Sequence, residues 1–512
     1  MSAKPNKCEI NALEKGKLRT IIFSKFISKK NKRKLKRMNK PYIIYILLFV
    51  SMFFFVVTNS ADRDSQFNRL SKIGDIHNYT NLASNRSAQN ELDNSILMAA
   101  YKVPLENIRN YTSELSQKFG FNGSILIAKN GKILFEEHLG YKDLRQKNPI
   151  DSTSIYQLAS VSKQFTAAAI LLLYQEGKLD LDDFASKYLT DFPYKNIKIR
   201  HLLNHTSGLP NYMYAAEKNW KSKTPPDNAA MLNLMAKLKM YPYFKPGERF
   251  DYSNTGYFVL ASIVSKVSNQ SLSDFLDSRF FKPLNLKNTY VHNPNEASKK
   301  EELIGFRRYG KSYIAIPFTV NDGVVGDKGV YSTASDLFKW NQSLNERTIL
   351  NDSILSKAFL PGKTNSGKIV PYGFGFRLKQ EADTELVYHN GVWNGFSTTL
   401  RRYKADDITI IILSNNSFSS ITPVSEKLRE LSKEFSKYDP FMSFLENTNI
   451  YDISKLKNSL KYFTNIPKAE SVAIIEKIAN IYNKQNVQFV SHKYPEVSSP
   501  NFVNQQYQTL LN

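Results

Sequence analysis

Apolar residues in this 512-residue chain form short groups whose spacing predicts particular elements. Residues 124–128 and 133–137 are rich in branched and aromatic side chains, and Asn130-Gly131 between them is a favoured pair for a tight hairpin turn. Near the other end of the chain, residues 408–414 are mostly β-branched, which is typical of a buried strand. The pattern predicts a sheet that joins segments far apart in the sequence.

The central helix of the chain is predicted from residue 160 to residue 176. Alanine and leucine, which favour helix, dominate its apolar part, and Gly177 stands where a helix would stop. Further helices are predicted at 258–267, 334–344 and 425–435. Strands at both ends with helices between them indicate a mixed α/β domain.

The N-terminal region has a different pattern. Residues 1–41 form a basic leader, and residues 42–58 form an apolar segment of a length between a membrane span and the core of a signal peptide. Positive charge before such a segment keeps the leader in the cytoplasm and sends the rest of the chain across. Translation from Met38 would instead make the segment an ordinary secretory signal. The third interpretation, a buried core helix, is disfavoured because basic and polar sequences flank the segment.

The remaining composition divides the chain further. Residues 59–104 are polar and predict a linker, whereas residues 105–436 carry the alternating apolar elements of a folded domain. Residues 437–512 are rich in Asn, Lys, Ser and Tyr and predict a C-terminal appendage, which contains one amphipathic helix at 468–483.

The net charge of +24 is unevenly distributed along the chain. The first 40 residues hold 14 Lys/Arg and 2 Asp/Glu, which is half of the excess, and no long basic block follows them. We therefore expect no nucleic-acid partner. The single cysteine, Cys8, excludes a disulfide within the chain, and the seven histidines do not cluster as metal ligands. No metal and no cofactor are expected.

Candidate chemistry begins at the start of the central helix. Ser160 and Lys163 are one helical turn apart, so their side chains share a face. A serine hydroxyl becomes nucleophilic when a neighbour takes its proton, and a lysine in an apolar site can have a pKa low enough to do so. An ordinary helix that starts with polar residues is the alternative for this motif taken alone.

Two further motifs follow in order: Tyr252-Ser253-Asn254 and His389-Asn390-Gly391. Taken alone, the first could be a turn with Asn254 capping a helix, and His389 could be a surface strand residue. Together the three motifs resemble those of the serine β-lactamase-like superfamily, and most closely the branch of class C β-lactamases, D-alanyl-D-alanine carboxypeptidases and related esterases. The resemblance covers residues 105–435. It implies an antiparallel sheet flanked by helices, a mostly helical subdomain, and a site between them.

The resemblance also implies roles for individual residues. Ser160 would be the acylated nucleophile and Lys163 would help to deprotonate it. Tyr252 would act as general base and later as acid, and Asn254 would bind the substrate amide. The backbone N–H groups of Ser160 and Val392 would form the oxyanion hole.

The third motif departs from the family pattern. His389 stands where many members have a lysine, and a histidine is mostly neutral at pH 7, which weakens the prediction of β-lactamase activity. Gly391 is expected to let substrate lie close against its strand. Both residues are predicted to bind substrate.

These features predict a cell-envelope serine hydrolase that forms an acyl-enzyme on Ser160. Its substrate would be a peptide, amide, ester or lactam of the D-amino-acid peptidase or esterase type. A membrane-anchored penicillin-binding-like sensor with little turnover and a true β-lactamase are the alternatives. The expected partners are a small-molecule or peptidoglycan-peptide substrate and, through the N-terminal segment, a membrane. The catalytic domain would lie outside the cytoplasm, as part of a single-pass membrane protein or, after signal cleavage, free in the periplasm.

Overall fold

The computed structural model describes residues 101–293, 301–310 and 312–439. The chain divides into two units between Glu91 and Leu92, and all described residues belong to the second unit. The basic leader, the apolar segment 42–58 and nearly all of the predicted linker and C-terminal appendage lie outside the described residues. No helix within the described ranges is long and apolar enough to cross a membrane.

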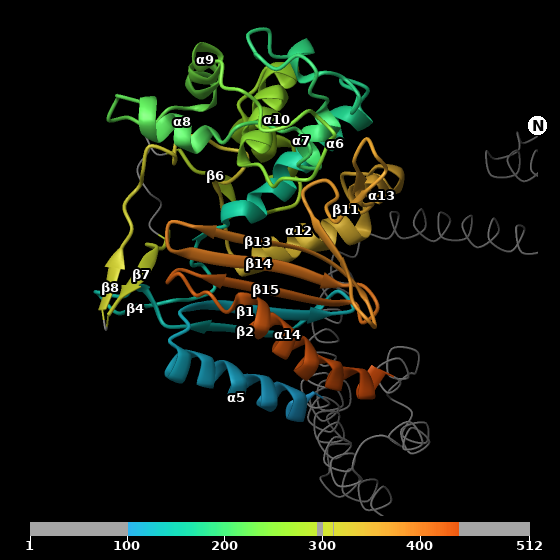
Figure 1. The fold of residues 1–512 in the computed structure, drawn as a ribbon. Coiled ribbons are helices and arrows are strands. Elements are labelled where there is room, and N and C mark those ends of the chain that lie inside the picture. The colour runs from blue at the N-terminus through green and yellow to red at the C-terminus, as the bar shows by residue number, and fades with distance from the viewer. Residues whose placement is uncertain (1–100, 294–300, 311, 440–512) are drawn as a thin grey trace, which may run out of the picture. The chain divides into compact units, whose positions relative to one another are not determined.

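A six-stranded antiparallel sheet joins the two ends of the described chain (Figure 1). Strand β1 pairs with both its hairpin partner β2 and the distant β15, where Leu126 lies opposite Ile411. This confirms the predicted hairpin and the predicted sheet of distant segments. The sheet has the order β12 (Arg377–Gln380), β13 (Glu385–Trp393), β14 (Phe396–Tyr403), β15 (Ile408–Ser414), β1 (Gly123–Lys129) and β2 (Lys132–Leu139).

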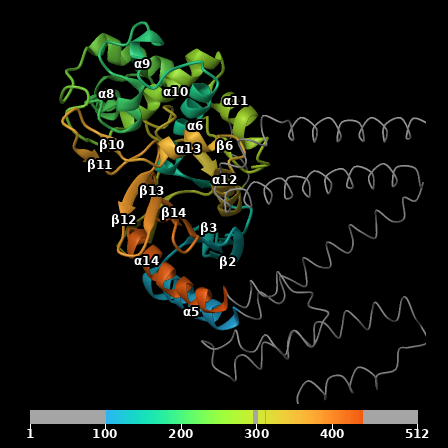
Figure 2. The same ribbon diagram turned by 90° about the vertical axis from the view of Figure 1, so that its right-hand side faces the viewer.

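Each face of the sheet is buried in its own apolar core, because neighbouring residues of a strand point to opposite faces. In β1, Leu126 belongs to the core shared with the helical part, whereas Ile125 and Ile127 belong to a second core. That second core is closed by α5 (Lys102–Phe119) and α14 (Ile421–Ser432), which cover one face of the sheet (Figures 1 and 2). Burial on both faces explains why β15, which is buried along its whole length, is mostly apolar.

Helix α6 (Lys163–Gln175) is the central helix predicted from the sequence, and it is buried from Lys163 to Leu173. From Phe165 to Leu173 it is apolar except for Thr166, because every face of this part of the helix meets other elements. A 3₁₀ turn, Ala159–Ser162, precedes it where the sequence predicted regular helix. The other helices around it are α7 (Ile199–Leu203), α8 (Tyr212–Asn219), α9 (Asn228–Leu238), α10 (Asn254–Ser268), α11 (Leu272–Leu276), α12 (Ala334–Glu346) and α13 (Asp352–Ala358).

Short strands and turns complete the described fold. A three-stranded sheet has the order β5, β9, β6, and its central strand follows the loop that faces α6. Segments 313–320 and 369–378 contain only short stretches of strand, because loops take up much of both segments. The small elements are β3 (Tyr141–Asp143), β4 (Asn148–Pro149), β5 (Tyr156–Gln157), β6 (Tyr290–Val291), β7 (Phe306–Tyr309), β8 (Ser312–Ala315), β9 (Val330–Ser332), β10 (Gly362–Lys363) and β11 (Ile369–Val370), with 3₁₀ turns at Ala185–Lys187 and Lys433–Tyr438 and a π-helical turn at Asp277–Phe281.

Candidate active site

Ser160 lies in the 3₁₀ turn before α6, where the chain approaches β13. Ala159, directly before it, has a positive φ of 49°, which is a strained conformation for a residue with a side chain. The two sides of the turn are held by Thr398 Oγ1, which donates to the Leu158 carbonyl at 2.7 Å, and by Ser162 Oγ, which accepts from Val330 N at 3.0 Å. The hydroxyl of Ser160 is therefore presented from a turn anchored to the sheet and to β9.

Lys163 is fully buried, and its amino group contacts three oxygen atoms. Nζ lies 3.0 Å from Ser160 Oγ, 2.8 Å from Asn254 Oδ1 and 2.8 Å from the backbone oxygen of Asp327. Burial lowers the pKa of Lys163 to about 7, the negative charge of Asp327 opposes this shift, and the positive charge of Arg377 adds to it. A neutral amine has two N–H donors and one lone pair, which match the two carbonyl oxygens and the Ser160 hydroxyl.

The second predicted motif forms the start of α10. Ser253 is the N-cap, since its hydroxyl accepts from Gly256 N at 3.2 Å. The amide oxygen of Asn254 is thereby left for Lys163, so Asn254 does not cap the helix. The structure places the two motifs in direct contact although 91 positions separate Lys163 from Asn254.

Tyr252 brings its ring against the same amino group. The Lys163 Nζ lies 5.0 Å from the ring centroid, and the Arg377 guanidinium carbon lies 4.9 Å from it. The hydroxyl is buried and lies near the Ser160 hydroxyl. Burial raises the pKa of Tyr252 well above its usual value, although the neighbouring Ser160 hydroxyl and Arg377 act in the opposite direction. The tyrosine is therefore a protonated phenol at neutral pH.

His205 packs against the second motif, Tyr252-Ser253-Asn254. It is fully buried, its ring centroid lies 4.3 Å from that of Tyr252, and its Nδ1 accepts from Ser253 N at 3.0 Å. Burial, together with the positive charge of Lys163, lowers the pKa of His205 well below its usual value. A neutral structural histidine fits these contacts.

The third predicted motif lies on β13, beyond the end of β12. The last residue pair between these strands is Arg377 with Tyr388, so the following residues border an open edge. Trp393 and Phe396 close a two-residue hairpin with Asn394-Gly395 at positive φ. In such a hairpin the closing pair, Trp393 and Phe396, exchanges both backbone hydrogen bonds, and the next pair, Val392 and Ser397, exchanges none. The N–H of Val392 therefore points away from β14, to the open edge. The side chain of Val392 is 73% exposed.

Gly391 faces the turn that carries Ser160. A Cβ at this position would collide with the carbonyl oxygen of Leu158 and with Thr398 Oγ1. The sequence interpretation attributed the need for glycine to a close substrate. In the structure the close neighbour is the chain itself, and Gly391 lets the nucleophile turn rest directly on the strand.

His389 is fully buried beneath the site. Its Nδ1 donates to the Asn390 carbonyl at 2.7 Å, so Nε2 accepts from the Tyr372 hydroxyl at 2.9 Å. Burial, followed by the charges of Lys163 and Arg377, lowers the pKa of His389 well below its usual value. Both ring nitrogens are engaged within the protein, and the ring lies 6.1 Å from that of Tyr252. The structure thus brings His389 to the site as a neutral packing group.

Sequence reasoning missed four residues around Lys163. Arg377 comes from β12, Tyr212 from α8, and Asp327 and Lys328 from the loop before β9. Only Asp327 and Lys328 could have been noticed in the sequence, where an adjacent acid and base stand between Gly326 and Gly329. In the structure both side chains are buried. Among the described residues no group of three or more His, Cys, Asp and Glu side chains could hold a metal ion.

The family of the chain follows from its sequence and agrees with this arrangement. Residues 111–428 match the model of the family described as Beta-lactamase. The chain belongs to the Beta-lactamase family. This confirms the predicted superfamily and makes the chain a serine hydrolase of that superfamily.

Two curated relatives cover much of the described domain. Penicillin-binding protein 4* of Bacillus subtilis is 37% identical over 316 residues, which are 59% of this chain and 69% of that protein. Protein flp of Staphylococcus aureus (strain MW2) is 28% identical over 333 residues, which are 63% of this chain and 65% of that protein. The chain therefore spans just under two-thirds of the second relative.

Solved structures show the same fold. A penicillin binding protein from Bacillus halodurans has a TM-score of 0.55 and 24% identity, with 62% of this chain and 98% of that chain covered. A D-amino acid amidase from Ochrobactrum anthropi SV3 has a TM-score of 0.54 and 23% identity, with 67% and 99% covered. The predicted antiparallel sheet with flanking helices is thus confirmed as the fold of this superfamily.

Proposed function

We propose that the protein hydrolyses an acyl substrate through an ester on Ser160, with Lys163 as the base. The observation that carries this proposal is the 3.0 Å contact between Lys163 Nζ and Ser160 Oγ in a buried site where the pKa of Lys163 falls to about 7. The neutral amine takes the hydroxyl proton while Oγ bonds to the acyl carbon. The bond to the leaving group then breaks, and water later attacks the ester, returns a proton to Ser160 and releases the acid.

Tyr252 has a different role in this proposal from the one that the resemblance implied. Its raised pKa keeps the phenol protonated, which suits a donor to the leaving group better than a base for Ser160. Lys163 then returns a proton to Tyr252 after each transfer. The N–H groups of Ser160 and Val392 are proposed to stabilise the oxyanion, because the Val392 N–H points to the open edge of β13 and the adjacent Gly391 packs against the turn that carries Ser160.

Arg377 supports a substrate with a negative charge. His389 is neutral and has both nitrogens engaged, so it does not supply the charge of the family lysine. The Arg377 guanidinium lies over the Tyr252 ring and forms no ion pair with an acidic residue in the part of the chain that the structure describes. A guanidinium binds carboxylates with two parallel hydrogen bonds. We therefore propose an ester, amide, peptide or lactam with a carboxylate near the scissile bond.

The names of similar proteins support D-amino-acid chemistry. One curated relative is a penicillin-binding protein, and one protein of the same fold is a D-amino acid amidase. We also propose that the enzyme acts in the cell envelope, on the outer side of a membrane. This part rests on the basic leader and the uncharged apolar segment that follows it.

Adduct mapping tests the proposed reaction. The full-length chain would be incubated with a fluorescent penicillin or a fluorophosphonate, and the modified peptide identified by mass spectrometry. We expect the label on Ser160, none in Ser160→Ala, and normal labelling in the control Ser186→Ala, which removes the hydroxyl of another serine. Label retained by Ser160→Ala would overturn the assignment. Rapid labelling without turnover of any ester, amide or lactam would instead identify a penicillin-binding sensor.

A further inference from the structure

The loop before β9 contains a buried acid–base pair that the proposed reaction does not use. Asp327 and Lys328 are 1% and 3% exposed, and Lys328 Nζ lies 3.5 Å from Asp327 Oδ1. Removing two charges from water is unfavourable unless their partners are well placed. Such a pair beside a nucleophile site therefore calls for a physical explanation.

Tyr212 holds the pair from α8. Its hydroxyl accepts from Lys328 Nζ at 2.6 Å and donates to Asp327 Oδ2 at 3.1 Å. Lys328 also donates to the Val324 carbonyl at 3.2 Å and lies 4.9 Å from the ring centroid of Trp393, the last residue of β13. The pair is thus connected both to the helical part and to the strand that borders the nucleophile.

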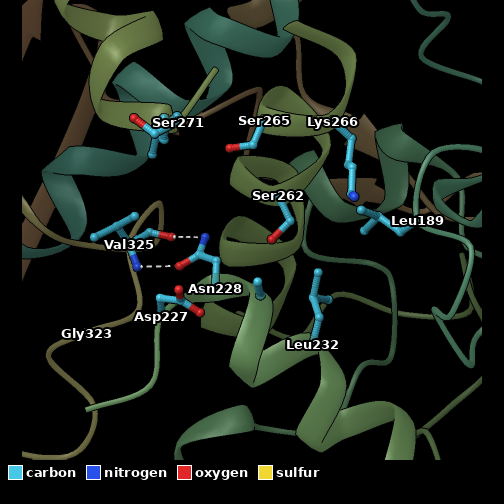
Figure 3. A pocket seen from close by; sticks show the side chains of 12 residues that line it. Leu189, Asp227, Asn228, Leu232, Ser262, Ser265, Lys266, Ser271, Gly323 and Val325 are labelled. Carbon is cyan, nitrogen blue, oxygen red and sulfur yellow. Dashed lines mark hydrogen bonds between the residues drawn. The ribbon is translucent and has the colours of Figure 1, made fainter. Parts of the chain in front are cut away.

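The backbone of the same loop is held on two sides. Toward α6, the carbonyl of Asp327 accepts from Lys163 Nζ at 2.8 Å, and that of Gly326 accepts from Thr166 Oγ1 at 2.7 Å. Toward α9, the Asn228 amide bonds both the N–H and the carbonyl of Val325, at 2.8 and 3.0 Å. Figure 3 shows this double contact at the edge of a cavity of about 280 Å³.

We propose that Asp327 and Lys328, held by Tyr212, position Lys163 and balance the charge around its amino group. Asp327 contributes a carbonyl that orients the amine and a carboxylate that favours its charged form. Lys328 offsets this carboxylate, so that Lys163 is able to be neutral when Ser160 must lose its proton. The inference rests on the proposed function, because it concerns how the base of that reaction is prepared.

Opposite effects of the two charges follow from this arrangement. Without the Lys328 cation, the Asp327 carboxylate would act on Lys163 unopposed and raise its pKa. Without the Asp327 charge, the pKa of Lys163 would fall further. The other groups that face or act on Lys163 stay unchanged in either variant: Ser160, His205, Tyr252, Asn254, Tyr257, Arg377 and His389.

The test measures the titration of Lys163 itself. The full-length chain would be labelled with ¹³C-lysine, and the Lys163 signal assigned by its loss in Lys163→Arg. We expect a wild-type midpoint near 7, a midpoint about one pH unit higher in Lys328→Gln, and one about one pH unit lower in Asp327→Asn. Lys328→Arg, which keeps the cation, should restore the wild-type midpoint. Tyr212→Phe keeps both charges and should move the midpoint less than either charge removal.

A second readout separates this inference from the proposed function. The rate of fluorophosphonate labelling at Ser160 would be followed against pH in the same variants, and its acid limb should move with each NMR midpoint. If the Lys163 midpoints of Lys328→Gln and Asp327→Asn stay together, or move in the same direction, the positioning role is overturned even if Ser160 is labelled. If the midpoints move apart as expected but Ser160 takes no label, the positioning role stands and the proposed reaction is wrong. If one of the two charge variants fails to fold, the direction in which the Lys163 midpoint moves in the other variant still tests the inference.

Discussion

The two sides of the candidate site hold their functional groups in different ways. On the helical side, Ser160, Lys163 and Asn254 are connected by hydrogen bonds of 2.8 to 3.0 Å, and the lysine is fully buried. On the strand side, His389 is fully buried while Val392, three positions later, is 73% exposed. The helical side therefore has the features of a fixed proton-transfer centre, and the strand side those of a boundary between the core and the substrate.

The difference follows from the geometry of the two elements. Residues three apart in a helical segment share a face, so Ser160 and Lys163 meet the same neighbours. Neighbouring residues of a strand point to opposite faces, so His389 and Gly391 face inward and Val392 does not. Substitutions on the helical side should accordingly change the chemical step most, and those on the strand side should act through packing.

Replacement of the base should have the largest effect. Lys163→Met should slow acylation of Ser160 about 1,000-fold, within the range for loss of a general base. Lys163→Arg is the matched control, because it keeps the cation but cannot take up a proton near neutral pH. Stopped-flow labelling with a fluorophosphonate measures both. An arginine variant that retained wild-type rates would show that charge, rather than proton transfer, is what the residue supplies.

Loss of the Tyr252 hydroxyl should depend on the leaving group. Tyr252→Phe should slow turnover of an amide or ester about 100-fold, because the leaving group then lacks a proton donor. The same variant should react with a fluorophosphonate almost normally, since fluoride leaves without a proton. Parallel assays with the two reagents compare these rates. Equal losses with both would favour Tyr252 as the base for Ser160, as the family resemblance implied.

On the strand side, an added methyl group should move the nucleophile. Gly391→Ala forces the Leu158 carbonyl and the Ser160 turn away from β13. Such a displacement should slow the labelling of Ser160 by up to about 100-fold. The neighbouring Val392→Ala removes exposed side-chain atoms and leaves the backbone N–H in place, so it should be nearly silent. Labelling rates and thermal unfolding of the pair check this. An active Gly391→Ala with unchanged stability would contradict the packing role.

Substitution of His389 by the lysine that many family members carry should destabilise the protein instead of creating a substrate-binding cation. His389→Lys would place an ammonium in a fully buried position beside Lys163 and Arg377 and lower the free energy of unfolding by about 2 kcal/mol. His389→Gln, which is neutral and keeps an acceptor for Tyr372, should cost about half as much. Thermal melts compare the two. A more stable His389→Lys that binds a carboxylate substrate tightly would mean that the side chain reaches the substrate.

Much of the fold was predictable because its signals are local. The hairpin around Asn130-Gly131, the strand at 408–414 and the apolar helix after Ser160 are each specified by a few adjacent residues. The 3₁₀ turn at Ala159–Ser162 was not predicted, since its shape depends on contacts with β14 and β9. The role of Arg377 was also hidden, because only the pairing of β12 with β13 brings its side chain to Tyr252.

Motif spacing and hydrophobic period are properties of neighbouring residues, so the amino-acid sequence alone specifies which reactive groups are present and in what order. It thereby predicted the superfamily, which the family match confirms. The protonation state and contacts of each group, by contrast, depend on the folded chain. Burial, together with the charges of Asp327 and Arg377, which are far from Lys163 in the sequence, brings the pKa of Lys163 to about 7. Burial also makes His389 a neutral packing residue. Proton affinity depends on the solvent and charge around a group, and folding assembles that environment from segments far apart in the chain.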